Sequence, residues 1–172
     1  MNFLPKYCRR IAETSAALCL ILSAGCVYQL GTSLPPNMRS VHVPLFSNRS
    51  GEPLVETEVT HAIISEIQRD GNLKIVSPDT ADIILEGALT AFALEPIQYE
   101  RDAPKRAREY RLRLAADITV RKRSGETILT RSVKGENTFM LLGDLTSAKR
   151  AAFPKAAADL AHNVVECIIE YW

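Results

Sequence analysis

Residues 110–121 read YRLRLAADITVR, and this stretch decides the kind of fold that the chain adopts. An apolar residue stands at every second position: Tyr110, Leu112, Leu114, Ala116, Ile118 and Val120. Successive side chains of a β-strand point to opposite faces, so the alternation predicts a strand with one buried face and one basic, solvated face. At the usual rise per residue this strand spans roughly 40 Å, which is long for a small domain.

Further strands are predicted on both sides of this stretch. The turn over residues 123–126 (RSGE) leads into a strand over residues 127–138, and residues 83–95, which hold few charges, predict the strand before it. Upstream, residues 41–45 predict a first strand, and residues 54–70 place apolar side chains at helical spacing.

Gly71 should end this first helix, and residues 73–76 form a short strand. A right-handed crossover would make the first strand and this one parallel, with the helix on one face. A second helix near the C-terminus carries an apolar stripe of Ala157, Leu160, Ala161, Val164 and Ile168. Thr146 or Ser147 is expected to cap it, and Pro154 to bend it or reset its start.

The predicted fold is therefore α+β. Two helices pack on one face of a mixed four- to five-stranded sheet, in the order β-α-β-β-β-β-α.

The first 25 residues predict a lipoprotein export signal that is removed. A positively charged segment precedes the apolar run of residues 16–24, and small residues then lead to Cys26, whose thiol would carry diacylglycerol. We therefore expect a signal peptide (1–25), a lipidated tether (26–38) and one domain (39–172). An ordinary secretory signal or an uncleaved anchor are the alternatives, although the apolar run is half the length of the ~20 residues that span a membrane.

Val27 follows Cys26, where an inner-membrane retention signal would have aspartate, so we expect an anchor on the periplasmic face of the outer membrane. A diacylglyceryl group and an amide-linked acyl chain on Cys26 would exceed the two signals that stable anchoring requires.

Charge is divided unevenly along the chain. Residues 52–100 hold ten acids and two bases, whereas residues 101–134 hold eleven bases and four acids, which favours a charged partner. The bases can be a solvated sheet face, or an anion site for a phosphorylated glycolipid or an acidic protein, because arginine binds phosphate bidentately. They include Arg101, Lys105, Arg106, Arg108, Arg111, Arg113, Arg121, Lys122 and Arg123.

The sequence contains no nucleophile elbow, CxxC, HExxH, P-loop or dinucleotide-binding motif. Aromatic residues that would stack on bases are sparse in the basic region. We therefore expect a protein that is not an enzyme, holds no metal or cofactor and binds no nucleic acid. Cys167, the one cysteine left beyond Cys26, is predicted to be a core residue.

Several segments resemble the LptE-type lipopolysaccharide-assembly lipoproteins. They are residues 26–31 (CVYQLG), 41–53 (VHVPLFSNRSGEP), 69–71 (RDG), 81–87 (ADIILEG) and 109–112 (EYRL). Val27 departs from the usual glycine of the family's opening motif. The resemblance implies a protein that plugs the LptD-type outer-membrane β-barrel and helps it to assemble for lipopolysaccharide insertion.

The resemblance also implies contact with lipopolysaccharide through basic residues near strand ends. The matching candidates are Arg106 and Arg108, then Lys105, with Lys149 near the second helix as a weaker one. An alternative comes from residues 41–53, which also resemble the CsgG-like and LpoB-like lipoproteins that form secretion pores or activate cell-wall synthases. A periplasmic hydrolase, the third possibility, lacks a nucleophile constellation.

Overall fold

A computed structural model of the chain describes residues 35, 38–102 and 106–171. The chain divides into two compact units, residues 1–31 and residues 32–172, and all described residues belong to the second. The predicted signal peptide, Cys26 and Lys105 lie outside the described residues. The elements are β1 (Ser40–His42), β2 (Ser47–Asn48), α2 (Val55–Asp70), β3 (Lys74–Ile75), β4 (Ile83–Tyr99), β5 (Ala107–Lys122), β6 (Thr127–Met140) and α3 (Leu145–Glu170).

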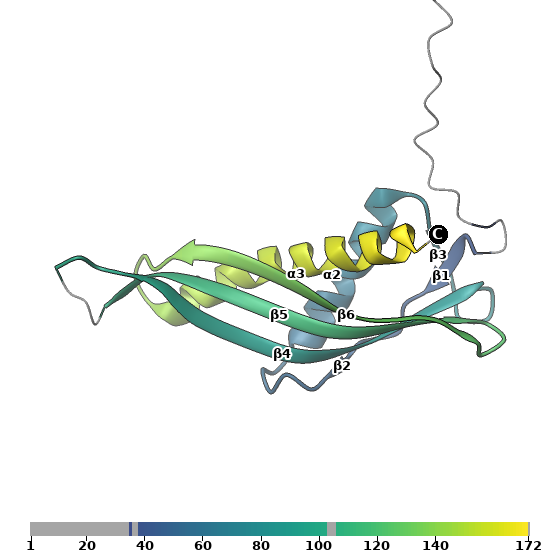
Figure 1. The fold of residues 1–172 in the computed structure, drawn as a ribbon, viewed down its shortest axis with the longest axis horizontal. Helices are drawn as coiled ribbons and strands as arrows, with labels where there is room; N and C mark the ends of the chain where they lie inside the picture. The colour runs from purple at the N-terminus through teal and green to yellow at the C-terminus, as the bar shows by residue number, and fades with distance from the viewer. Residues whose placement is uncertain (1–34, 36–37, 103–105, 172) are drawn as a thin grey trace, which may run out of the picture. The chain divides into compact units, whose positions relative to one another are not determined.

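The six strands of the described residues form one mixed sheet in the order β3-β1-β4-β5-β6, with β2 beside β4 (Figure 1). Strand β1 is parallel to β3 and to β4, as the predicted crossover requires, whereas β4, β5 and β6 are antiparallel. Both helices lie on the same face of the sheet. The α+β prediction and its element order are confirmed, with the two-residue β2 as an addition.

The long strand predicted at residues 110–121 is β5, which lies between β4 and the edge strand β6. In β5 Leu112, Leu114, Ala116, Ile118 and Val120 are buried against the helices. The strand begins earlier than its periodicity predicts, at Ala107, and β4 runs on to Tyr99. These two strands, of 17 and 16 residues, span roughly 55 Å at the usual rise per residue.

A bulge in β4 changes which residues face the core. The pairing with β5 skips one residue between Leu89 and Ala91. Before the skip the odd-numbered Leu85 and Leu89 are buried, and after it the even-numbered Phe92 and Leu94 pack against the core. An extra residue on one strand reverses the alternation of side chains, which is how a bulge re-aims a strand.

The helix ends differ in part from the prediction. Gly71 caps α2 with φ 78°, as expected, but Asp144, not Thr146 or Ser147, caps α3. The Asp144 side chain accepts hydrogen bonds from the backbone N–H groups of the two residues expected to be caps, which leaves their own side chains no capping role. Pro154 lies inside α3 and so does not reset its start.

Cys167 packs against the core, as predicted, and is half-buried. Burial raises the pKa of its thiol, which keeps it protonated. No helix in the described part of the chain is long and apolar enough to cross a membrane.

Candidate functional site

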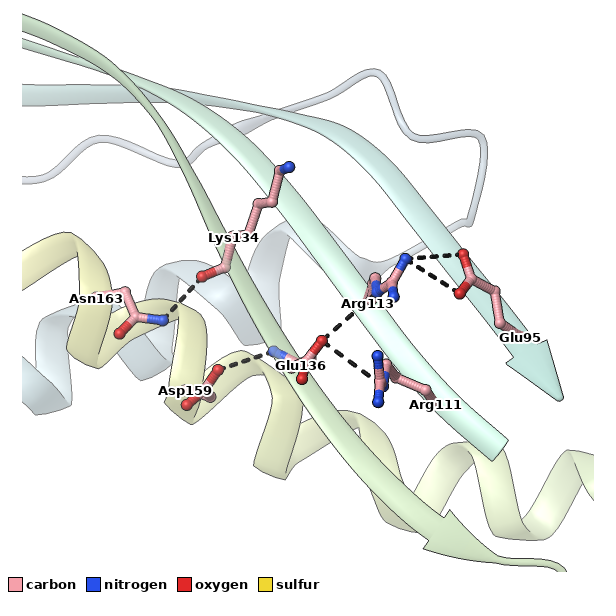
Figure 2. Close-up of polar contacts among 7 residues, drawn as sticks. All are labelled: Glu95, Arg111, Arg113, Lys134, Glu136, Asp159 and Asn163. Carbon is pink, nitrogen blue, oxygen red and sulfur yellow. Dashed lines mark hydrogen bonds and ion pairs between the residues drawn. The ribbon is translucent and has the colours of Figure 1, made fainter. Parts of the chain in front are cut away.

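The arginines of β5 that face away from the helices are paired with glutamates of the two neighbouring strands. Arg113 lies 3.1 Å from Glu95 of β4 and 3.5 Å from Glu136 of β6 (Figure 2). Arg111 lies 3.8 Å from the same Glu136, and its buried Nε has no hydrogen-bond partner among the described residues. Exposed pairs of this kind contribute about 0–1 kcal/mol each to stability.

Arg121 and Glu86 repeat this arrangement further along β5, at 3.4 Å. The uneven charge of the sequence is thus partly neutralised inside the sheet, because acid-rich β4 is the direct neighbour of base-rich β5. The solvated face was expected to be basic, but cross-strand pairing balances much of its charge. A charged partner must therefore be sought where arginines lack such partners.

The same open face carries a hollow of about 630 Å³ over small side chains of β4 and β5. Ala91, Ala93 and Ala115 form part of its lining, and the paired Arg113 and Glu136 stand beside it. Lys134 and Asp159 also line the hollow, so it carries charges of both signs besides the paired Arg113 and Glu136.

Two side chains of α3 occupy the outer edge of β6, the last strand of the sheet (Figure 2). Asp159 accepts a hydrogen bond from the Glu136 N–H at 2.8 Å, and Asn163 donates one to the Lys134 carbonyl at 2.8 Å. An uncovered edge strand invites pairing with another chain, so these contacts protect this part of the edge.

Arg106 and Arg108 lie at the end of the sheet that the helices do not cover. Here the β4–β5 hairpin projects past the start of α3 (Figure 1). We call this end, formed by residues 97–102, 106–109 and 140–142, the ribbon tip. Arg106 lies 3.7 Å from Glu100, whereas Arg108 makes no ion pair with any residue that the structure describes.

Two irregularities in the pairing mark the ribbon tip. On β4 the register skips Ile97, and on β5 it skips Arg108, between the pairs Pro96–Tyr110, Gln98–Glu109 and Tyr99–Ala107. A residue outside the regular ladder can direct its side chain differently from its neighbours. Arg108 therefore differs from the other arginines of β5 in two ways: it makes no ion pair with a described residue, and it has no cross-strand partner in β4.

The ribbon tip also carries exposed apolar side chains that the sequence analysis did not identify as functional. Met140 pairs with Glu109, and the Leu141 N–H donates to the Arg108 carbonyl at 2.8 Å, which places the end of β6 beside the arginine. Tyr99 pairs with Ala107 on the other side. The exposed set is Ile97, Tyr99, Met140 and Leu142. Cations and apolar groups therefore share one end of the sheet.

Lys149, the remaining candidate, lies elsewhere. Its Nζ is 2.7 Å from Glu52 and 5.5 Å from the centre of the Phe92 ring, beside a separate hollow of about 380 Å³ that Phe153 also lines. Arg106 and Arg108 thus both lie at the ribbon tip, whereas Lys149 lies on α3 with its charge already paired to Glu52.

Histidines and acids of the described residues form no group of three that could hold a metal ion. His162 of α3 lies 3.1 Å from Glu66 of α2, and this carboxylate also accepts a hydrogen bond from Arg69 at 2.6 Å. The hydrogen bond from Arg69 lowers the pKa of Glu66, and the contact with His162 adds to this. These contacts join α2 to α3, and none of their residues belongs to the ribbon tip.

Comparison with known proteins connects this fold to one family. A family model described as LptE, lipopolysaccharide-assembly, matches residues 38–168. No curated protein sequence matches the chain.

Solved structures with a similar fold come from several bacteria. A DUF330-family protein from Xanthomonas campestris has a TM-score of 0.58 at 11% identity, over 82% of this chain and 91% of that one. A minor lipoprotein from Acinetobacter baumannii has a TM-score of 0.53 at 11% identity, over 77% and 94%. A hypothetical protein from Chlamydia trachomatis has a TM-score of 0.53 at 10% identity, over 77% and 96%. At such identities these likenesses concern the fold alone.

Proposed function

Because the chain belongs to the LptE lipopolysaccharide-assembly family, we propose that it is an outer-membrane lipoprotein that plugs an LptD-type β-barrel and helps it to assemble. In this role the lipid on Cys26 holds the protein at the periplasmic face of the membrane, after removal of residues 1–25. The domain acts by fitting against its partner and by binding lipopolysaccharide. It needs no bond-making chemistry, metal or cofactor.

One observation carries this proposal: the family match extends from Met38, a buried residue at the start of the fold, to Ile168, the last buried residue of α3. It therefore covers the whole core and both helices, not one motif. The fold agrees independently, because two helices cover one face of the mixed sheet and leave the other face and the ribbon tip open for contact.

Within this role Arg106 and Arg108 are proposed to contact lipopolysaccharide, with Lys105 beside them in sequence and Lys149 as a secondary candidate. Guanidinium groups stay charged and bind phosphate oxygens in pairs, which suits the phosphates of lipid A. Arg108 supports the proposal best, since no described acid neutralises it. The arginines on the open sheet face are weaker candidates because their glutamate partners already occupy them.

Isolation of the native complex tests the plug role. The full-length protein, extracted from its own membranes under gentle detergent conditions, should bring down a β-barrel of large mass. Recovery of the protein alone would contradict the proposal. Recovery with a cell-wall synthase would favour the LpoB-like alternative, and recovery as a ring of identical copies the CsgG-like one.

The anchor is tested separately by Cys26→Ser. We expect loss of labelling by palmitate and accumulation of the unprocessed precursor. A variant of normal mature size that lacks palmitate would indicate an ordinary secretory signal instead.

Charge reversal tests the lipopolysaccharide contact. Arg106→Glu with Arg108→Glu should weaken binding to lipid A while the Tm stays close to that of the wild type, since both side chains are exposed. Arg49→Glu with Arg131→Glu, also exposed and far from the tip in β-sheet register, makes the same change in net charge and serves as the control. An equal loss of lipid A affinity in both double variants would mean that only the net charge of the protein matters, not the position of these arginines.

A further inference from the structure

Leu54, directly before α2, combines a strained backbone with an exposed apolar side chain. It is the one residue other than glycine with a positive φ in the described part of the chain, at φ 66° and ψ 12°. A leucine in this left-handed conformation is strained, and strain of this kind gathers at sites of function. Its side chain is 79% exposed, so the fold gains little packing from it. A role for this leucine must therefore be sought in a contact outside the chain.

Leu54 stands between two hollows of the surface and lines both. The first hollow, of about 380 Å³, has an apolar floor of Phe92 from β4 and Phe153 from α3, whose ring centres are 5.9 Å apart. The second, of about 620 Å³, follows the exposed side of α2 over the small side chains of Thr57 and Ser65. An exposed leucine beside a hollow with an aromatic floor can interlock with a partner, as the buried anchors of protein interfaces do.

The charges around the first hollow are balanced. Glu52 and Glu58 supply two acids, and Lys149 and Arg150 supply two bases. The Nζ of Lys149 lies 2.7 Å from the Oε1 of Glu52, so one base and one acid already satisfy each other. The phosphates of an anionic lipid would meet the acids as well as the bases. A polar rim around an apolar centre is instead typical of a protein–protein interface, so the occupant that this surface fits is a protein.

We propose that Leu54 and these two hollows form a protein-docking surface. Leu54 enters an apolar pocket of the partner, and the partner places an apolar side chain over Phe92 and Phe153. The occupant is the β-barrel, so this inference rests on the proposed function and gives the barrel contact a place on the domain, at the start of α2 and its junction with α3. None of the residues of this surface belongs to the ribbon tip.

Substitutions of Leu54 separate docking from folding. Glycine and asparagine both adopt a left-handed conformation readily, so Leu54→Gly and Leu54→Asn remove the apolar side chain without disturbing the backbone. The full-length variants, extracted gently from their own membranes, should recover about tenfold less barrel per copy than the wild type, because an apolar anchor is lost. Their Tm should equal or exceed that of the wild type. Leu54→Met, which keeps an apolar side chain of similar size, should recover nearly as much barrel as the wild type.

Leu45→Asn is the matched control, because Leu45 is 64% exposed and lines neither hollow. It should leave barrel recovery at the wild-type level. Wild-type recovery in Leu54→Gly and Leu54→Asn would overturn the docking surface and leave the plug role standing. Equal losses in Leu45→Asn and Leu54→Asn would also overturn it, because any exposed leucine would then have the same effect. A loss accompanied by a lower Tm in both Leu54 variants would overturn it as well, since unfolding would account for the loss.

A photo-crosslink identifies the occupant. Benzoylphenylalanine substituted for Thr57, an exposed residue of the second hollow, should form an adduct with the barrel when the full-length protein is irradiated in its own membranes. An adduct with a second copy of this chain, or with lipopolysaccharide, would overturn the barrel as occupant. Failure of the proposed function gives a different result: the wild type itself is then recovered without a barrel, and the docking surface falls with the plug role.

Discussion

The backbone of Leu160 in α3 lies directly against Gly135 of β6. A Cβ atom built at position 135 would come within 2.6 Å of the Leu160 Cβ and closer still to its backbone N. The neighbouring contacts of Asp159 and Asn163 with the β6 backbone are made at this same point. The absence of a side chain at position 135 therefore sets how closely the second helix approaches the sheet.

We expect Gly135→Ala to destabilise the fold by about 1–3 kcal/mol, because α3 must move away and lose its contacts with the edge of β6. Urea unfolding measures the cost. Leu160→Ala should not restore stability, since the overlap involves the backbone N and Cα of residue 160 as well as its side chain. Recovery in the double variant would mean that only the Leu160 side chain stands in the way.

Gly87 gives the contrasting case. A Cβ there would overlap the ring of Phe46, a fully buried side chain, and no backbone atom is among its nearest contacts. Gly87→Ala should therefore also destabilise by about 1–3 kcal/mol. Here a smaller partner should help: in Phe46→Leu, itself destabilising, the added cost of Gly87→Ala should fall. A double-mutant cycle measures this coupling, and strict additivity would contradict the contact.

The parts of the fold that followed from the sequence are those with an uninterrupted period. Residues 110–120 of β5 alternate without a break, and the helix of residues 55–70 ends at a glycine, so both were predictable from local pattern. β4 was harder, because the bulge between Leu89 and Ala91 shifts its apolar residues from odd to even positions. In the sequence, residues 83–94 (IILEGALTAFAL) form a mostly apolar run without the alternation that would show which side chains face the core.

The sequence indicated which residues could form the candidate site, but not which side chains lie next to them or how exposed they are. Arg113 and Glu95 are 18 positions apart, and only the register of β4 against β5 brings them together. In the sequence Ile97 and Met140 look like ordinary strand residues. They are exposed because this end of the strands extends past the start of α3. The capping role of Asp144 was missed because Thr146 and Ser147, both good capping residues, follow it directly.

The start of the fold is held by Asp82, and this gives a pH-dependent prediction. Its carboxylate accepts hydrogen bonds from the Ser40 hydroxyl at 2.6 Å, the Ser40 N–H at 3.0 Å and the Arg39 N–H at 3.2 Å. The Ser40 hydroxyl does most to lower the pKa of Asp82. A lowered pKa in the folded state adds stability that is complete above the unfolded value, about 3.9, and is lost as the pH falls through the folded value.

Asp82→Asn should therefore cost about 1 kcal/mol at neutral pH, and the gap from the wild type should close as the pH falls below about 4. Urea unfolding across pH 3 to 7 measures the gap. Asp79→Asn, an exposed aspartate in the preceding turn, is the control and should leave stability nearly unchanged at all these pH values. A constant gap for Asp82→Asn would show that the ionised carboxylate is not what Ser40 recognises.

Leu54, directly before α2, has φ 66°, a left-handed conformation that costs a leucine roughly 1–2 kcal/mol. Its side chain is 79% exposed, so little packing offsets this cost. Leu54→Gly should then stabilise the fold by about 0.5–1 kcal/mol, even though glycine gains more freedom in the unfolded chain. Leu45→Gly removes a similarly exposed side chain where φ is not positive, and it should destabilise. Thermal unfolding of the two variants distinguishes these effects, and a lower Tm for Leu54→Gly would mean that the leucine side chain holds the start of α2 in place.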